Sequence, residues 1–218
     1  MRRDACALLL GVALVACPPR ARAQLAFEGH VSLQTQSFRL LSSIRNRATE
    51  FHATASGIEA TIFAPTRRLG VQLQQMSAAA AEVNAGKYAA SSLTVLYGSV
   101  SRAAELGIGR RAGYSDRSDR DNDATYGFYR LGGRIVAPLS TLGFQVGLRG
   151  SLHVPIDFDR RDGATGYEAG TSVRWNSTRV PFTAALEFRS ERFQVARGVQ
   201  QEFSAVTLAA GWAFKRAP

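Results

Sequence analysis

The stretch GFQVGLRGSLHVPI, residues 143–156, has an apolar residue or a glycine at every second position. These positions are Phe144, Val146, Leu148, Gly150, Leu152, Val154 and Ile156. The positions between them include Gln145, Arg149 and His153, so an apolar series alternates with a largely polar one. Successive side chains of a β-strand point to opposite faces of the sheet. The spacing therefore predicts a single long strand with one apolar face and one polar face.

The same alternation recurs along the rest of the chain, between stretches that are rich in turn-forming residues. It predicts ten strands, with eight or twelve as alternative counts, at residues 27–38, 50–64, 68–77, 88–99, 103–113, 125–138, 142–156, 166–176, 181–192 and 200–214. Short connections, such as 139–141, alternate with longer polar ones, such as 39–49, 114–124 and 193–199. This layout predicts an all-β fold, an up-and-down antiparallel barrel with one tight rim and one elaborated rim. An even number of strands places both ends of the barrel wall at the tight rim.

The N-terminal segment has the features of a secretory signal peptide. Two arginines near the start precede an apolar run at residues 5–16, and a small-x-small cleavage site ends at Ala23. The apolar run is shorter than the roughly 20 residues that a membrane-spanning helix needs. We expect residues 1–23 to be removed as a signal peptide and residues 24–218 to form one β-barrel domain.

Lipidation is the alternative for this segment, because LVAC at residues 14–17 resembles the lipobox of bacterial lipoproteins, in which Cys17 would carry the lipid. Two prolines directly after Cys17 favour cleavage after Ala23 instead. Cys6 and Cys17 are the only cysteines, so the mature chain would have none for a disulfide or a metal. The expected leader carries +3 of the formal charge of +10 and leaves +7. A basic balance is common among nucleic-acid-binding proteins, but we expect no nucleic-acid partner for an exported chain.

The polar face of the predicted strands is unlike an ordinary solvated surface. In the strands with the clearest phase it carries seven charged residues, Arg130, Arg134, Arg149, Arg174, Arg189, Glu168 and Glu187. Small residues such as Gly132, Gly147 and Gly170 are interspersed, which suits a confined interior where each long side chain needs space opposite it. An arginine that faces lipid at the bilayer midplane costs about 2–4 kcal/mol, so turning five outward would cost on the order of 10–20 kcal/mol. We therefore expect an arginine-rich charge network inside the barrel.

The strands of a soluble barrel or sandwich also alternate between apolar and polar residues, but with the apolar side chains inside. Strand length favours a membrane barrel, because most predicted segments have ten or more residues, whereas soluble strands usually have about five or six. Aromatic residues near the strand ends also favour it, since membrane interfaces select them. Near the tight rim we expect an aromatic belt of Phe63, Tyr97, Phe144, Trp175, Phe182, Trp212 and Phe214. Near the other rim lie Phe51, Tyr88, Tyr114, Tyr126, Phe158, Tyr167 and Phe203.

With its leader, its alternating strands and the final segment FSAVTLAAGWAF at residues 203–214, the chain resembles small bacterial outer-membrane β-barrel proteins as a broad class. The resemblance implies a place in the outer membrane of a Gram-negative cell. It also implies contact with outer-membrane lipid and lipopolysaccharide, and recognition of the aromatic C-terminal strand by the barrel assembly machinery. That signal normally finishes on the last residue, whereas four residues follow Phe214 here.

Ten strands enclose an interior that side chains can largely fill. The expected function is therefore structural, or a surface interaction made through extracellular loops. A small porin-like channel that prefers anions is one alternative, since charged linings set pore selectivity. A lipid- or peptide-modifying enzyme is another, with Ser151, His153 and Asp157 as weak catalytic candidates. The aspartates in SDRSDRDND, residues 115–123, lack the glycine and the final glutamate of a calcium-binding loop, and we expect no metal and no cofactor.

Overall fold

The computed structural model describes residues 27–44, 47–64, 68–78, 88–113, 124–156, 164–195 and 199–216, and its regular structure is β-strand throughout. The strands are β1 (Phe27–Ile44), β2 (Arg47–Ala64), β3 (Leu69–Ala78), β4 (Tyr88–Gly98), β5 (Arg102–Gly113), β6 (Ala124–Pro138), β7 (Phe144–Ile156), β8 (Ala164–Asn176), β9 (Phe182–Val195) and β10 (Val199–Arg216). The predicted count of ten is confirmed. Within the described ranges there is no helix long and apolar enough to span a bilayer.

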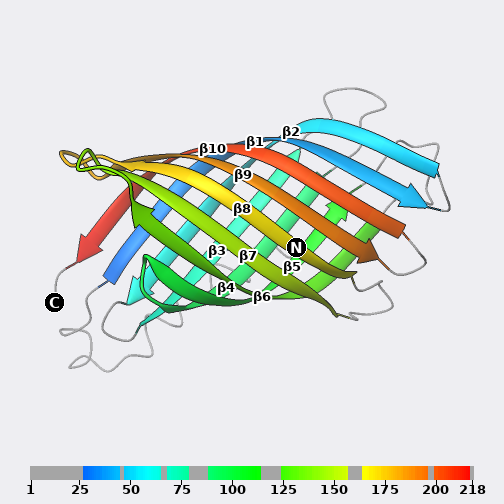
Figure 1. Cartoon of the computed structure of the whole chain (residues 1–218), viewed down its shortest axis with the longest axis horizontal. Coiled ribbons are helices and arrows are strands. Elements are labelled where there is room, and N and C mark those ends of the chain that lie inside the picture. The colour runs from blue at the N-terminus through cyan, green and yellow to red at the C-terminus, as the bar shows by residue number, and fades with distance from the viewer. Residues whose placement is uncertain are drawn as a thin grey trace, which may run out of the picture.

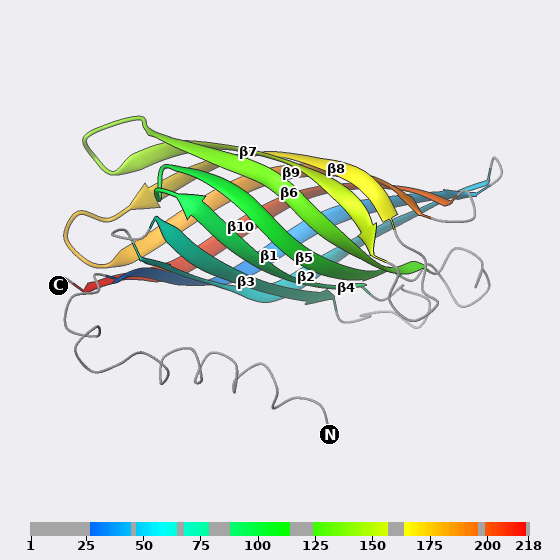
Figure 2. The same cartoon turned by 90° about the horizontal axis from the view of Figure 1, so that it is seen from below.

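The ten strands form one closed antiparallel barrel with up-and-down topology (Figure 1). Each strand pairs with its neighbours in sequence, and β1 closes the sheet against β10 from Phe27↔Arg216 to Ser43↔Gln200. β1 therefore begins at the same rim where β10 ends, and the hairpins β4–β5, β6–β7 and β8–β9 turn at this rim too (Figure 2). We call it the tight-turn rim and the opposite end the far rim.

A glycine at the tight-turn rim shows why these short turns have their sequence. Gly143 has φ of 88°, and a Cβ atom at this position would lie 2.1 Å from the carbonyl oxygen of Asn176. Only glycine adopts this conformation without strain and leaves room for the neighbouring hairpin. The position thereby helps to set where β7 begins beside the end of β8.

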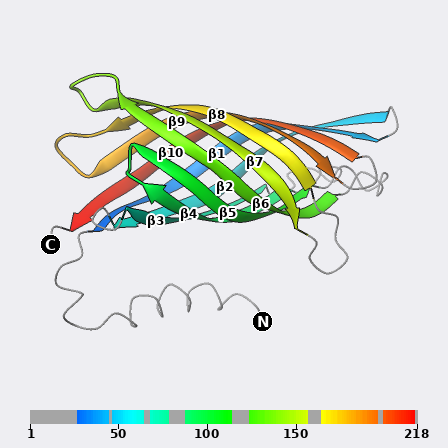
Figure 3. The ribbon, with the colours of Figure 1, turned by 60° about the horizontal axis from the view of Figure 1, so that its bottom comes forward.

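The first hairpin is longer than the sequence pattern predicts. β1 and β2 are each 18 residues long and remain paired up to Ile44↔Arg47, so the long connection predicted at 39–49 is wrong. The two strands reach beyond the rest of the far rim (Figure 3). β9 and β10 likewise continue into the predicted connection 193–199, with only 196–198 between them. In this extension of the first hairpin, apolar side chains face inward and polar ones outward. Phe38, for example, is buried inside the barrel, whereas Arg39 is exposed outside.

The outer surface of the extension carries charges that pair with one another. Arg39 donates from Nε and Nη2 to the two carboxylate oxygens of Glu50, at 2.7 and 3.1 Å. His52 Nε2 lies 2.7 Å from the same carboxylate. Hydrogen bonds from Arg39 and His52 lower the pKa of Glu50 below its usual value. A polar outer face of this kind is suited to water, and it marks where the apolar surface of the barrel ends.

Between the extension and the tight-turn rim, the outer face of the barrel wall is apolar and the inner face is largely polar, as the alternation predicts. Large apolar side chains are exposed on the outside of all ten strands, for example Leu33, Leu106, Leu131, Leu148 and Leu208, each 59–71% exposed. The residues between them are buried inside the barrel, and many are polar or charged. The barrel is therefore apolar outside and polar within over most of its length.

Candidate functional site

An alternating chain of charges crosses the interior from β5 to β8, and we call it the charge ladder. Arg134 Nε lies 2.5 Å from Glu105 Oε1, and Arg149 Nη2 lies 3.2 Å from Glu105 Oε2. Arg149 Nε also lies 3.4 Å from Glu168 Oε1, and Arg130 pairs with the second oxygen of Glu168. Both glutamate side chains are fully buried. Since a buried charge is stabilised only when it is paired, each member depends on its neighbours.

Small residues provide the space for this ladder. Arg149 lies opposite Gly170 in the strand register, and Arg130 lies opposite Gly107. Glu105 lies opposite Gly132, where a Cβ atom would come within 2.5 Å of Ser151 Cβ. Arg149, Arg130 and Glu105 therefore each have a glycine, which carries no side chain, beside them in the sheet.

A second charged cluster lies nearer the far rim, between β5 and β9. The carboxylate of Glu191 forms ion pairs with two arginines: Arg111 Nη2 lies 2.5 Å from Oε2, and Arg189 Nε lies 3.0 Å from Oε1. The guanidinium of Arg111 also lies over the rings of Phe203 and Phe193, 4.7 and 4.9 Å from their centroids. An arginine stacked on aromatic faces gains a cation–π interaction that is stronger where water is excluded. This cluster ties ionic and aromatic groups into one packed region.

Two groups of aromatic rings pack beside the second charged cluster. We call these rings and the second charged cluster together the plug. Phe38, Tyr88 and Phe203 pack with centroids 4.5–5.5 Å apart. Phe128, His153 and Phe193 form a second group at 4.4–5.4 Å. All six of these residues are at most 3% exposed. The plug fills the interior between the charge ladder and the far rim.

The predicted catalytic candidates Ser151 and His153 are brought together inside this filled region. Ser151 Oγ lies 3.1 Å from His153 Nε2, and Glu168 lies 3.6 Å from the same nitrogen. Arg130 Nε also approaches that nitrogen at 3.5 Å. In a Ser-His-Asp triad, one ring nitrogen of the histidine faces the serine and the other is bound by the carboxylate. Here Ser151, Glu168 and Arg130 all approach the same nitrogen of His153. Ser151 and His153 are 5% and 1% exposed, so no substrate reaches them in this conformation, and Asp157 lies outside the described residues.

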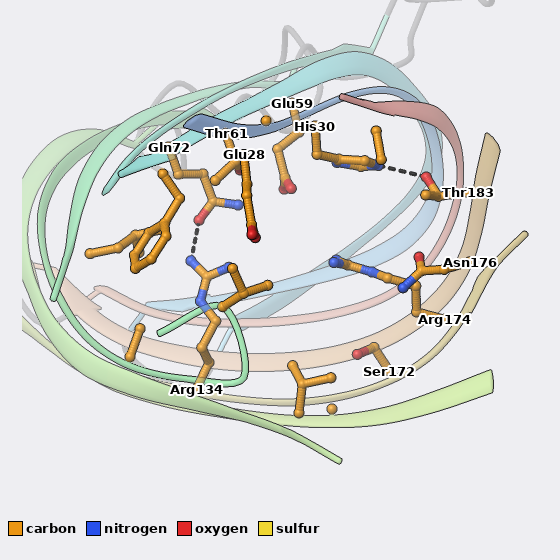
Figure 4. Close-up of a pocket in the computed structure, with 18 of the residues that line it drawn as sticks. Glu28, His30, Glu59, Thr61, Gln72, Arg134, Ser172, Arg174, Asn176 and Thr183 are labelled. Carbon is orange, nitrogen blue, oxygen red and sulfur yellow. Dashed lines mark hydrogen bonds between the residues drawn. The ribbon is translucent and has the colours of Figure 1, made fainter. Parts of the chain in front are cut away.

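Toward the tight-turn rim the interior opens into a cavity of about 510 Å³ (Figure 4). Its mouth is formed by rim residues that include Ser99, Asn176 and Pro181, and its floor by Arg134 and Arg149 of the charge ladder. We call this space the rim cavity. It occupies the half of the barrel that the plug leaves open.

The charged groups of the rim cavity are less fully paired than those of the ladder. Arg174 reaches from β8 toward the middle of the cavity, and Glu59 and His30 lie across from it (Figure 4). Among the described residues, no hydrogen bond or ion pair involves the guanidinium of Arg174 or the carboxylate of Glu187. Glu59 accepts one hydrogen bond, from Gln34 at 3.2 Å. His30 is 2.7 Å from the hydroxyl of Thr183.

One wall of the rim cavity is apolar. Phe63, Leu96 and Ala103 form a small buried cluster that lines it. This arrangement corrects the predicted position of Phe63, which is only 4% exposed and lies inside the barrel instead of in an outer belt. Its odd position on β2 has the opposite parity to the outward-facing Ile58, which is the physical reason for its orientation.

The other predicted aromatic positions divide between the two faces. Six side chains near the tight-turn rim face outward, Tyr97, Phe144, Trp175, Phe182, Trp212 and Phe214. Near the far rim Tyr167 faces outward, whereas Tyr88 and Phe203 belong to the plug, so their predicted place in an outer belt is wrong. The side chains of Phe51 and Tyr126, and all of Tyr114 and Phe158, lie outside what the structure describes.

Four charged residues of the interior are not among those predicted from the sequence. On the described strands, six arginines and five glutamates point inward between the rims: Arg111, Arg130, Arg134, Arg149, Arg174, Arg189, Glu59, Glu105, Glu168, Glu187 and Glu191. Glu59, Glu105, Arg111 and Glu191 are the ones not predicted. Leu106 and Ile108 share one face of β5, and that parity alone would have placed Glu105 and Arg111 inside. In the described part of the chain, no cluster of three or more His, Cys, Asp or Glu side chains could hold a metal ion.

The chain resembles several solved outer-membrane proteins in fold. The outer membrane protease OmpT from Escherichia coli matches at 10% identity and a TM-score of 0.49, over 88% of this chain and 97% of that one. Ail, the attachment invasion locus protein of Yersinia pestis, matches at 12% identity and a TM-score of 0.35, over 86% and 98% of the two chains. OccK7 of Pseudomonas aeruginosa matches at 13% identity and 0.34, over 81% of this chain and 52% of that one. No protein-family profile and no curated protein matches the sequence.

Proposed function

We propose that this protein is an integral outer-membrane β-barrel with a closed, non-conducting interior, which acts as a compact envelope protein through its far-rim loops. The observation that carries the membrane assignment is the apolar outer surface, which is continuous around all ten strands. Monomeric soluble proteins rarely expose apolar patches larger than a few hundred Å². An encircling apolar surface is instead suited to lipid.

The dimensions of this surface support the proposal. On β7 the outward apolar series runs from Phe144 to Val154. At about 3.3 Å per residue and a tilt of about 40°, this series spans about 25 Å along the barrel axis, which is the height of the apolar band of outer-membrane barrels. Trp175 and Trp212 lie toward one end of the band, where membrane interfaces select aromatic side chains. The partners we propose are outer-membrane lipid, lipopolysaccharide and, during insertion, the barrel assembly machinery.

Two features support a closed interior over an anion-preferring channel. The plug and the charge ladder consist of side chains that are almost completely buried, so they leave little room for a hydrated ion. Arginines and glutamates are also nearly balanced, at six against five between the rims. Anion-selective passages are lined by rings of positive side chains such as Arg or Lys. Here most arginines are paired with a carboxylate.

The same burial argues against an enzyme centred on Ser151 and His153. His153 packs against Phe128 and Phe193 of the plug, and Ser151 beside it is only 5% exposed, so a substrate has no access to either side chain. We assign His153 instead to the polar network that holds β6, β7 and β8 together. The contacts of the protein with other molecules are then left to its surfaces.

Substitutions on one face of β10 test the membrane assignment. Leu208 is 62% exposed within the apolar band, and Ser204 points to the same side where the polar extension begins. If lipid covers the band, Leu208→Arg costs about 2–4 kcal/mol, whereas Ser204→Arg near the interface costs about 0–1 kcal/mol. The readout is urea titration of the barrel in lipid vesicles, with the heat-dependent gel shift of folded barrels as the measure of the folded fraction. Equal effects of the two variants, or a chain that stays in solution without detergent, would overturn the assignment.

Planar-bilayer recording tests the closed interior. We expect inserted protein to produce no steady current, because the plug and ladder block the axis. Protease protection in vesicles of the same lipid verifies that the barrel inserts. A steady anion-selective conductance from inserted protein would favour the channel over the closed barrel.

A further inference from the structure

We propose that the rim cavity binds a small zwitterion, a free α-amino acid with an apolar side chain. The proposal goes beyond the role of the barrel in the membrane, and it does not depend on which side of the membrane the tight-turn rim faces. It rests on three features of the cavity: its unpaired charges, its apolar wall and its volume.

The charges of the cavity favour a ligand with one anionic and one cationic group. Arg174 offers a guanidinium that has no ion pair with any described residue, which is the group best suited to bind a carboxylate. Glu59 and Glu187 offer carboxylates that accept an ammonium group. Arg174 and Glu187 lie on the paired strands β8 and β9, so a cation and an anion stand side by side on one wall. Glu59, which interacts electrostatically with Arg174, lies across from it (Figure 4).

The overall charge favours a ligand with no net charge. Glu28 at the mouth is neutralised by Lys215 at 3.0 Å. The three remaining charges of the cavity wall, Arg174 against Glu59 and Glu187, sum to one negative charge. The ladder beneath them has three arginines against two glutamates and supplies one positive charge. The cavity and its floor are therefore neutral together, which disfavours a simple anion or cation.

The apolar wall defines the rest of the ligand. Phe63, Leu96 and Ala103 lie together on β2, β4 and β5 and line the cavity. Arg174 and Glu187 belong to β8 and β9, on the other side of the barrel. A ligand that places its charged groups toward β8 and β9 therefore meets apolar carbon with its side chain. A volume of about 510 Å³ falls in the range of about 300–1,000 Å³ that is typical of small-molecule sites.

Equilibrium dialysis with four related probes tests the proposal, using the full barrel folded in detergent and verified by its gel shift. The probes are leucine, leucinamide without the carboxylate, N-acetyl-leucine without the ammonium group, and glycine without the apolar side chain. We expect leucine to bind saturably. Each of the other three lacks one feature that the cavity recognises, and the two charge-deficient probes should bind about 10-fold to 100-fold more weakly, as expected for a lost charged hydrogen bond. No saturable binding of leucine, or equal binding of leucinamide or N-acetyl-leucine, overturns the proposal.

Variants locate the site. Arg174→Gln and Glu187→Gln should each weaken leucine binding by about 10-fold or more. Arg192→Gln, on the outer surface near the far rim, serves as the matched control and should bind like the parent protein. Unchanged binding in both cavity variants would mean that leucine binds elsewhere, and the assignment to the cavity would be wrong. Ligand binding is measured in detergent, whereas the membrane assignment is tested by urea unfolding in lipid vesicles. Failure of the ligand proposal therefore leaves the membrane assignment standing, and the reverse also holds.

Discussion

The two halves of the barrel interior are built from the same strands and differ in the size and pairing of their inward side chains. On β9 the inward positions toward the far rim are Arg189, Glu191 and Phe193, and all three are buried and packed together with other members of the plug. Toward the tight-turn rim the same strand presents Thr183 and Ala185 inward. The result is a filled half and an open half within one continuous wall.

This difference shows that side-chain volume, and not the number of strands, decides where a ten-stranded barrel is closed. Ten strands enclose a space that large side chains can fill and small ones cannot. The pairing of charged side chains also differs between the filled half and the open half. In the filled half a guanidinium excluded from water must have a carboxylate beside it, whereas Arg174 in the rim cavity is without an ion pair among the described residues.

The largest expected contrast compares two inward glutamates on adjacent strands, Glu168 and Glu187. Glu168→Gln removes the carboxylate that Arg130 and Arg149 share, so two buried cations lose a partner and the barrel should be destabilised by about 3–5 kcal/mol. Glu187→Gln removes a carboxylate without an ion pair in the described chain and should cost about 1 kcal/mol or less. Urea titration in lipid vesicles, followed by the fluorescence of Trp175 and Trp212, measures both effects. Similar costs for the two variants would mean that the two halves do not differ in how they treat charge.

Cysteine labelling offers a more direct comparison of access, because both natural cysteines lie in the expected leader. Ser172 lines the rim cavity, and Ser151 is 5% exposed within the filled half. Ser172→Cys should react readily with a small water-soluble thiol reagent. Ser151→Cys should react about 100-fold more slowly if local opening of the filled half costs about 2.8 kcal/mol. Labelling of the urea-unfolded chains, where both thiols are accessible, is the control, and equal rates in the folded barrel would contradict a closed far half.

The sequence alone predicted the wall of the barrel well and its interior incompletely. Period-two alternation located all ten strands, because the membrane-type pattern persists wherever lipid and the polar interior lie on opposite faces. It failed on the first hairpin, since beyond the apolar band Phe38 points inward and Arg39 outward. There the apolar side chain is on the inner face and the charged one on the outer face, so the membrane-type alternation predicts a connection from residue 39 instead of a continued strand.

For the interior, the sequence predicts which side chains point inward, but not which of them form ion pairs with one another. The parity of Phe203 relative to Leu208 places Phe203 inside the barrel, whereas its position near the strand end alone predicts a place in an outer belt. That Arg149 joins Glu105 to Glu168 depends on the register of β5 to β8. Register depends on the pairing of whole strands, and the identities of single residues do not reveal it.

Two glycines test how tightly each half is packed. A Cβ atom at Gly132 would lie 2.4 Å from the carbonyl oxygen of Gly150 and 2.5 Å from Ser151 Cβ. At Gly170, which lines the rim cavity, the nearest atom is 3.2 Å away. Gly132→Ala should therefore cost about 1–3 kcal/mol through overpacking, and Gly170→Ala should cost clearly less. The urea midpoint of each variant in vesicles measures the difference, and a larger cost at Gly170 would contradict the packing contrast.

The smallest effect is expected where charges pair outside the barrel, in water. Arg192 and Glu202 lie 3.3 Å apart on β9 and β10, with side chains that are 46% and 48% exposed. Exposed ion pairs are screened and typically contribute only about 0.2–1 kcal/mol. A double-mutant cycle of Arg192→Gln and Glu202→Gln should therefore give a coupling energy in that range, which decreases as salt is added. The matching cycle of Arg130→Gln and Glu168→Gln should give a larger coupling that changes little with salt, because these side chains are 4% and 0% exposed. If both cycles responded to salt alike, water would reach the charge ladder, and the far half of the barrel would not be closed.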